Sequence, residues 1–228
     1  MKQIWSKSLA CLLCLALLVG MLPVGALAED NPPAPANDGI SLLADSISYI
    51  DDKGITQTRD SATEVTGSDT TWGADDNVEH WYVVNSTLTI DGRIEVTGDV
   101  HLILANGCTL NATKGINVSG GNSLTIYAQS AGDNMGVLTA TGANLQAGIG
   151  GNNVQSGGAI TINGGKVTAN GGDSGAGIGG GFYGTGGNIT INGGEVTANG
   201  GDSGAGIGGG DDCGAGGNIT ITGGTVKA

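Results

Sequence analysis

Apolar residues recur two positions apart through the second half of the chain, in short runs separated by glycine. In the clearest unit the pairs are Ile160/Ile162, Val167/Ala169 and Ala176/Ile178. A spacing of two predicts β-strands that carry these side chains on one face. Gly-Gly or Asn-Gly follows each run and supplies the positive φ that a sharp corner needs. The unit therefore predicts three short strands joined by corners.

This unit repeats with a period of 29 to 30 residues. Residues 157–169 (GGAITINGGKVTA) recur with few changes as residues 186–198 and again as residues 216–228, while residues 170–181 recur unchanged as residues 199–210. One such unit cannot bury its own apolar face, but stacked units share an interior. We therefore expect an all-β fold, a right-handed parallel β-helix with three strands per coil.

Weaker coils precede these repeats. Their apolar positions are Val84, Leu88/Ile90 and Ile94/Val96; Leu102/Leu104, Leu110/Ala112 and Ile116/Val118; and Leu124/Ile126, Leu138/Ala140 and Ala147/Ile149. We expect about five coils in a β-helix domain over residues 81–228. Because the chain stops in mid-coil at Ala228, we expect further coils and a surface anchor in a longer protein, or a partner paired with the last edge.

Residues 1–28 have the features of a secretory signal peptide. Two lysines precede an apolar run over residues 9–22, and residues 26–28 (Ala-Leu-Ala) match the small-x-small cleavage pattern. The run is shorter than the ~20 apolar residues that a membrane-spanning helix needs. We expect cleavage before Glu29 and an extracellular or cell-surface protein. The alternative is an uncleaved anchor.

Residues 29–80 connect the signal peptide to the first coil. Residues 29–45 are polar and proline-containing at first and predict a linker. Residues 46–58 alternate on both sides of Asp-Asp-Lys-Gly, which predicts a β-hairpin. An uncovered solenoid end invites pairing with other chains. We therefore expect residues 46–80, with the region of Trp72, Trp81 and Tyr82, to form a hairpin cap on the first coil.

Charge excludes some partners. After loss of the signal peptide, six basic and 21 acidic residues leave a formal net charge of −15. Such a surface repels nucleic acid and anionic membranes, and it attracts cations. We expect no nucleic-acid partner and no membrane span in the mature chain.

Cysteine and histidine are scarce in the mature chain. Cys108 and Cys213 lie about three coils apart, beyond the ~7 Å Cα separation that a disulfide tolerates, so we expect no bridge between them. The chain has two histidines, His80 and His101, and no Cys-x-x-Cys. A zinc site is therefore not expected.

Asp173 and Asp202 occupy equivalent positions in adjacent repeats. In register they lie ~5 Å apart, one strand spacing. Carboxylates this close repel each other unless a cation bridges them or water screens them. The pair is a candidate calcium site, since calcium takes oxygen ligands in flexible geometry. The alternative is two solvated surface aspartates.

Phe182 and Tyr183 fall in a loop between strands, and the next repeat has Asp211 and Asp212 there. Exposed aromatic rings beside carboxylates suit carbohydrate binding, through stacking and hydrogen bonds to hydroxyls. These four residues are the candidate ligand site. The alternative is that Phe182 covers the coil edge as a hydrophobic lid.

Three further patterns have a structural interpretation. Residues 175–180 fit G-x-G-x-x-G, but a strand follows instead of the helix that a dinucleotide site needs, so we interpret them as a corner. Lys166 and Glu195 share one outward position and are expected to pair across coils. Asn163 with Asn192, and Asn170 with Asn199, are expected to form amide ladders.

The repeat carries a resemblance. The unit Gly-Gly-x-Ile-Thr-Ile-x-Gly-Gly-x-Val-Thr-Ala with Ala-Gly-Ile-Gly-Gly-Gly resembles repeats of secreted surface proteins from Gram-positive gut bacteria, and residues 81–85 and 100–107 look like the start of the same region. The resemblance covers about residues 46–228. More loosely, the repeat is similar to clostridial carbohydrate-binding β-helix proteins, which bind plant polysaccharide with calcium. No calcium ligand of that family is transferred to a residue here.

These observations predict a secreted or cell-surface, non-catalytic β-helix module that binds carbohydrate or mediates adhesion. The predicted partner is a polysaccharide or a host or cell-wall glycan, with calcium as the candidate cofactor. One alternative is a structural stalk of a longer surface protein. The other is a polysaccharide lyase or hydrolase, which needs a base with an acid-sugar clamp or paired carboxylates. The basic residues are scattered, and nothing marks Asp173 or Asp202 as an acid, so we predict no enzyme activity.

Overall fold

The computed structural model describes residues 46–212 and 214–228. The predicted signal peptide, the predicted linker and Cys213 lie outside these residues. Within them, every regular element is a strand. They accordingly hold no helix with the length and apolar character needed to cross a membrane.

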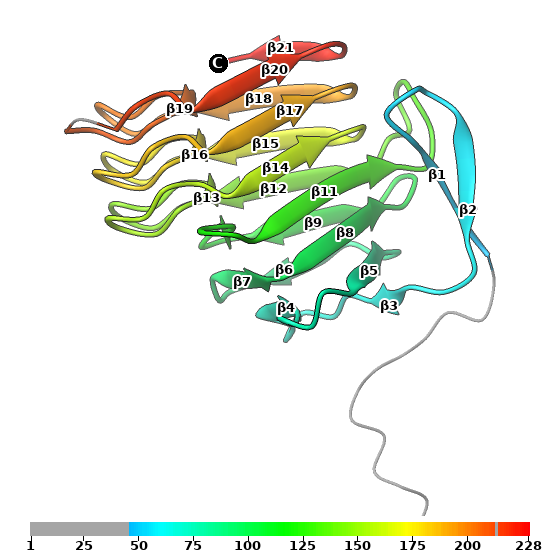
Figure 1. Ribbon diagram of the computed structural model, residues 1–228. Coiled ribbons are helices and arrows are strands. Elements are labelled where there is room, and N and C mark those ends of the chain that lie inside the picture. Colours follow the sequence, from blue (N-terminus) through cyan, green and yellow to red (C-terminus); the bar gives the residue numbers. More distant parts are fainter. Residues whose placement is uncertain (1–45, 213) are drawn as a thin grey trace, which may run out of the picture. The chain divides into compact units, whose positions relative to one another are not determined.

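Three parallel sheets form the walls of a β-helix (Figure 1). The first sheet contains β3 (Thr63–Glu64), β5 (Glu79–Val84), β8 (Asp99–Leu104), β11 (Ser123–Ala128), β14 (Ala159–Ile162), β17 (Asn188–Ile191) and β20 (Asn218–Ile221). The second contains β6 (Leu88–Ile90), β9 (Thr109–Ala112), β12 (Val137–Thr141), β15 (Lys166–Asn170), β18 (Glu195–Asn199) and β21 (Thr225–Lys227). The third contains β4 (Thr71–Gly73), β7 (Ile94–Thr97), β10 (Ile116–Asn117), β13 (Ile149–Gly150), β16 (Ile178–Gly179) and β19 (Ile207–Gly208).

The described residues form five complete coils, from β5–β7 to β17–β19, and β20 and β21 begin a sixth. Equivalent residues of successive coils lie directly above one another, as Ile160, Ile189 and Ile219 do. The apolar positions predicted from the alternation fill the interior, where Ile160 and Ile178 are fully buried. The predicted parallel β-helix with three strands per coil is confirmed.

Polar contacts between coils run along the outside of the stack. Asn192 donates through its side-chain amide to Asn163 Oδ1 at 2.8 Å, and Asn199 donates in the same way to Asn170 at 2.8 Å. Both predicted amide ladders are present. The predicted ion pair is present as well, with Lys166 Nζ 3.5 Å from a carboxylate oxygen of Glu195.

The predicted hairpin exists, but it does not cap the first coil. Its strands β1 (Ile47–Ile50) and β2 (Thr56–Arg59) pair antiparallel and lie beside the first sheet, against its outer face (Figure 1). Ile47 packs there with Trp81, Ile103 and Tyr127, which point outward from β5, β8 and β11. The prediction of a hairpin cap was wrong because these outward side chains make the sheet's outer face apolar, and the hairpin removes that face from water.

Trp72 fills the interior at the N-terminal end of the stack. It lies in β4, is 0% exposed and stacks on Tyr82 with ring centroids 5.7 Å apart. The backbone N–H of Gly73 donates to the Tyr82 hydroxyl at 2.8 Å. Parallel pairing already begins at Thr63, in β3, within the segment for which the sequence predicted a cap. The aromatic residues thus close this end from inside the coils.

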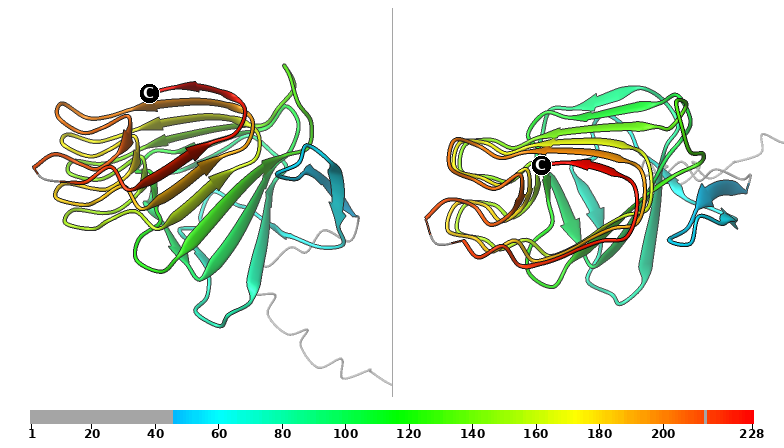
Figure 2. Two further views of the ribbon diagram at one scale, coloured as in Figure 1. Left: turned by 45° about the horizontal axis from the view of Figure 1, so that its top comes forward. Right: turned by 90° about the horizontal axis from the view of Figure 1, so that it is seen from above.

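Two glycine-rich loops flank each short strand of the third sheet from β13 onward. Around β13 they are residues 142–148 and 151–158, and the corresponding loops of later coils superimpose when the stack is seen from above (Figure 2). Loops of neighbouring coils are joined at their tips. The N–H of Phe182 donates to the carbonyl of Leu145 at 3.0 Å, and that of Asp211 to the carbonyl of Ser174 at 2.9 Å. These bonds hold the loops as parts of the stack.

Arg93 supports the first of these long loops from two coils below. Its guanidinium donates to the carbonyls of Lys114 (2.8 Å), Ala147 (3.0 Å), Gly150 (3.2 Å) and Gly151 (3.3 Å). Burial lowers the pKa of Arg93 to about 10. The group therefore stays charged at neutral pH, and each carbonyl receives a charge-assisted hydrogen bond.

Asp51 anchors the hairpin turn, and this predicts a pH response. Its carboxylate accepts hydrogen bonds from the Gln57 side-chain amide (2.9 Å) and from the backbone N–H groups of Ile55 (2.8 Å) and Lys53 (3.0 Å). These bonds, that of Gln57 first, hold the pKa of Asp51 below its ordinary value of 3.8. A carboxylate with a lowered folded-state pKa stabilises the fold above its unfolded-state pKa, and this contribution is lost as pH falls through the folded-state pKa.

We therefore expect the amide resonances of Lys53 and Ile55 to titrate with a midpoint below 3.8 in an NMR pH series. In Asp51→Asn this transition should disappear, while the resonances of the coils stay unchanged. A midpoint at or above 3.8 in the unaltered protein would contradict the assignment.

Candidate functional site

The loops that follow the third sheet bring the predicted aromatic and acidic residues together. The N–H of Tyr183 donates to the carbonyl of Asp211 at 3.1 Å, so the Phe182–Tyr183 pair of one coil lies against Asp211 and Asp212 of the next. The rings of Phe182 and Tyr183 contact each other, with centroids 4.1 Å apart. Phe182 is half-buried, whereas Tyr183 is 54% exposed. We call these four residues the loop edge.

The tip of this loop has the same backbone conformation in three successive coils. Val154, Tyr183 and Asp212 have φ angles of 55°, 60° and 55°. Few residues other than glycine adopt this left-handed conformation, and it persists where the surrounding structure determines it. All three side chains are exposed. One fixed position thus displays an aliphatic, an aromatic and an acidic side chain in turn.

The two carboxylates of the loop edge differ in their surroundings. Asp211 is half-buried, and its oxygens accept hydrogen bonds from the Ser174 hydroxyl at 3.3 Å and from the backbone N–H of Asp212 at 2.8 Å. Asp212 itself is exposed. Asp211 therefore helps to fix the loop, and Asp212 presents its carboxylate to solvent beside the exposed ring of Tyr183.

Asp173 and Asp202 lie in the other loop, the one that precedes the third sheet, and both are exposed. The carbonyl of Asp173 accepts a hydrogen bond from the N–H of Leu145 in the coil below at 2.8 Å, which ties this loop to its neighbour. Within the described part of the chain, neither aspartate belongs to a group of three close ligand side chains. Calcium binding at this pair stays a prediction.

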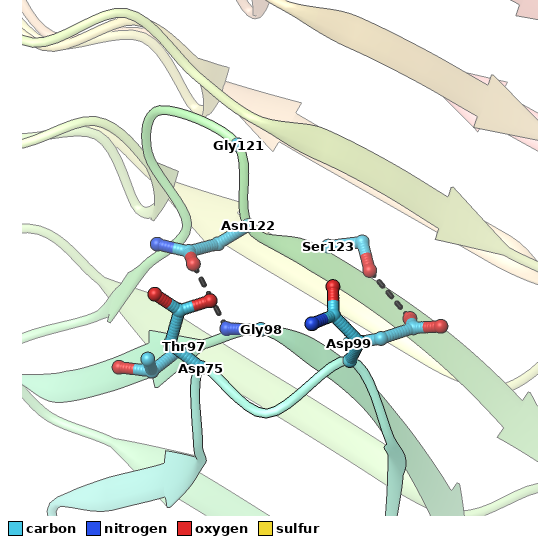
Figure 3. Close-up of a pocket in the computed structure, with 8 residues that line it drawn as sticks. Asp75, Thr97, Gly98, Asp99, Gly121, Asn122 and Ser123 are labelled. Carbon is cyan, nitrogen blue, oxygen red and sulfur yellow. Dashed lines mark hydrogen bonds between the residues drawn. The ribbon is translucent and has the colours of Figure 1, made fainter.

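A polar hollow on the early coils was not foreseen from the sequence (Figure 3). It has a volume of about 450 Å³ and is lined by Asp75, Asn77, Thr97, Gly98, Asp99, Gly121, Asn122 and Ser123. Figure 3 shows the Asn122 side chain accepting a hydrogen bond from the N–H of Gly98 at 2.9 Å, and the Ser123 hydroxyl donating to the Asp99 carboxylate. The lining residues come from three segments that are neighbours only in the stack. The hollow could therefore be predicted only if the register between these coils were known.

Comparison with known families agrees with this architecture. A family model described as a beta helix repeat matches residues 134–153, 160–182 and 189–211. These segments are similar to the beta helix repeat. We found no match to a curated protein and none to a solved structure.

The matched segments begin in the coil of β12 and β13 and continue through the two coils that follow. The second and third matched segments end at Phe182 and Asp211, so each of these repeats runs into the loop edge. The match agrees with the parallel β-helix that the strand pairing shows over these residues. The match does not predict the side chains of the loop edge, because the residue at the loop tip differs from one repeat to the next.

Proposed function

We propose that this chain is an extracellular, non-catalytic β-helix module that binds carbohydrate at the loop edge. One observation carries the proposal: Tyr183 is 54% exposed, and Asp212 occupies the same tip position one coil further. The apolar face of an aromatic ring suits the C–H face of a sugar, and its hydroxyl group offers a polar handle. A carboxylate accepts hydrogen bonds from sugar hydroxyls.

The rigidity of the loops supports this proposal. Backbone hydrogen bonds join Tyr183 to Asp211 and Phe182 to Leu145, so the aromatic pair is positioned before any ligand arrives. A preorganised surface loses less conformational entropy on binding than a mobile one. After loss of the signal peptide, the formal net charge of −15 favours neutral or cationic plant, host or cell-wall glycans over strongly anionic ones.

A glycan array, read with and without calcium, tests the proposal. We expect Tyr183→Ala to weaken binding at least about tenfold, which corresponds to ~1.4 kcal/mol. Val154→Ala is the matched control, because Val154 has the same exposed tip position in the preceding coil. Asp173→Asn and Asp202→Asn separate a calcium-dependent contribution from binding at the loop edge itself.

The regular stack favours one second candidate, a structural stalk. Ladders such as Asn163–Asn192 and ion pairs such as Lys166–Glu195 join coil to coil without involving any ligand. If no glycan binds the protein under either condition, the stalk replaces the binding module as the function. Release of reducing sugars or unsaturated products from a polysaccharide would instead require a lyase or hydrolase.

A further inference from the structure

Three potential metal ligands converge on the outer face of the first sheet. Glu79 in β5 pairs in register with Asp99 in β8, and His101 follows Asp99 by two residues. Since side chains alternate between the faces of a strand, all three point outward. One ligand atom from each lies within 4.8 Å of the others. We propose that Glu79, Asp99 and His101 bind a divalent transition-metal ion of the zinc type.

One ring nitrogen of His101 lacks a hydrogen-bond partner, and a metal ion would serve as its partner. Its Nδ1 lies 3.0 Å from the Tyr127 hydroxyl, and its Nε2 is buried without a hydrogen-bond partner. The nearest carboxylate oxygen, Asp99 Oδ1, is 3.5 Å from Nε2, too far for a good hydrogen bond. If Nδ1–H donates to Tyr127, the lone pair of Nε2 faces two carboxylates, and a cation between them resolves the conflict.

Each of the three side chains is held in place by a neighbour. Trp81 Nε1 donates to Glu79 Oε2 at 3.0 Å, and the Ser123 hydroxyl donates to Asp99. The indole ring of Trp81 also stacks on the imidazole, with centroids 4.3 Å apart and an interplanar angle of 13°. Metal ligands in proteins are oriented by such outer contacts, including a hydrogen bond to the second nitrogen of a ligating histidine.

The charges of the site fit a dication. Carboxylates facing each other on adjacent strands destabilise the pair, and a divalent ion neutralises Glu79 and Asp99 together. Among the described residues, no lysine or arginine forms an ion pair with either carboxylate; the guanidinium of Arg59 lies over the Trp81 ring instead, 4.9 Å from its centroid. Mixed imidazole and carboxylate donors suit zinc, and three protein ligands leave one coordination position open.

Solvent reaches the two carboxylates of the site, and Glu79 is exposed. The side chain of Asp99 is 47% exposed and contributes to the polar hollow of Figure 3, whereas that of His101 is 12% exposed and stacks on the rings of Trp81 and Tyr127. An ion can therefore enter past Asp99 and meet a nitrogen ligand from which water is excluded. The proposal is independent of glycan binding at the loop edge, which lies on later coils.

Titration calorimetry with zinc chloride on the full chain tests the proposal, and cobalt absorption spectra report the ligand types. We expect one ion per chain. His101→Phe keeps a ring against Trp81 but removes both nitrogens, and it should abolish binding. Glu79→Gln changes an exposed side chain, so the fold should persist while zinc affinity falls by at least about tenfold. Asp133→Asn changes an exposed carboxylate outside both candidate metal sites; it is the control for general acidity and should leave zinc affinity unchanged.

Tyr127→Phe tests the positioning role of the hydroxyl. It should keep the aromatic packing and lower zinc affinity by about 10- to 100-fold, the usual effect of removing an outer contact. The proposal is overturned if zinc does not bind, or if affinity is the same in His101→Phe and Glu79→Gln as in the unaltered protein. Intense cobalt–thiolate bands would also overturn it, because they would place the ion on cysteine.

Discussion

Gly179→Ala is expected to destabilise the β-helix by about 4 kcal/mol or more, a large part of the stability of an ordinary domain. Gly179 ends β16 with a φ of 134°, a conformation that residues with a Cβ rarely adopt. A Cβ at this position would overlap the carbonyl oxygen of Gly208 in the next coil. Both the strain and the overlap involve backbone, which cannot move aside without breaking the ladder between coils.

The measurement is urea unfolding followed by circular dichroism, and Gly121→Ala is the control. A Cβ added at Gly121 would meet no atom within 4 Å, and the φ of this glycine lies outside the left-handed region. The control substitution should change the free energy of unfolding by less than ~1 kcal/mol. Equal unfolding midpoints for the two variants would show that the coils do not approach each other as closely as described.

Arg93→Met is expected to cost about 3 kcal/mol, since it leaves several carbonyls without their charge-assisted partner. The four acceptors belong to two later coils, so one side chain joins the corner before β7 to the corner before β10 and to the region around β13. Methionine retains much of the length and apolar volume of the arginine stem. The decrease in the free energy of unfolding therefore measures mainly the lost hydrogen bonds rather than the creation of a cavity.

Lys166→Met is the matched control, because Lys166 also bridges coils but in an exposed ion pair with Glu195. Such pairs contribute ~0–1 kcal/mol. Thermal unfolding of both variants at neutral pH should show a clear decrease in melting temperature for Arg93→Met alone. Similar small shifts for the two variants would mean that water replaces the guanidinium at these carbonyls.

The late coils could be predicted almost completely from the sequence. In a solenoid each residue's neighbours are its equivalents one period away, so the 29-residue repeat that relates Ile160 to Ile189 also gives their register. The same argument predicted the contact of Lys166 with Glu195 and placed Asp211 and Asp212 beside Phe182 and Tyr183. The register between coils does not predict the ligand of the loop edge, because binding also depends on the shape of the ligand.

The early coils were harder to predict because their length varies. Val100 pairs with Leu124 and Leu124 with Ile160, which are steps of 24 and 36 residues. Without a fixed period, the sequence did not show that Glu79 and Asp99 lie opposite each other on adjacent strands. A zinc site was not expected because the chain has two histidines, whereas the proposed site uses His101 together with two carboxylates. The hairpin was misplaced for a related reason: its docking surface exists only once Trp81, Ile103 and Tyr127 are stacked.

The shared tip conformation of Val154, Tyr183 and Asp212 has an evolutionary consequence. Backbone bonds between coils determine the path of the loop, so substitution at a tip alters the surface without altering the scaffold. Each tip is one strand spacing, ~4.8 Å, from the next. Selection can thus vary an ordered row of side chains one at a time, and duplication of a coil lengthens the row by one position.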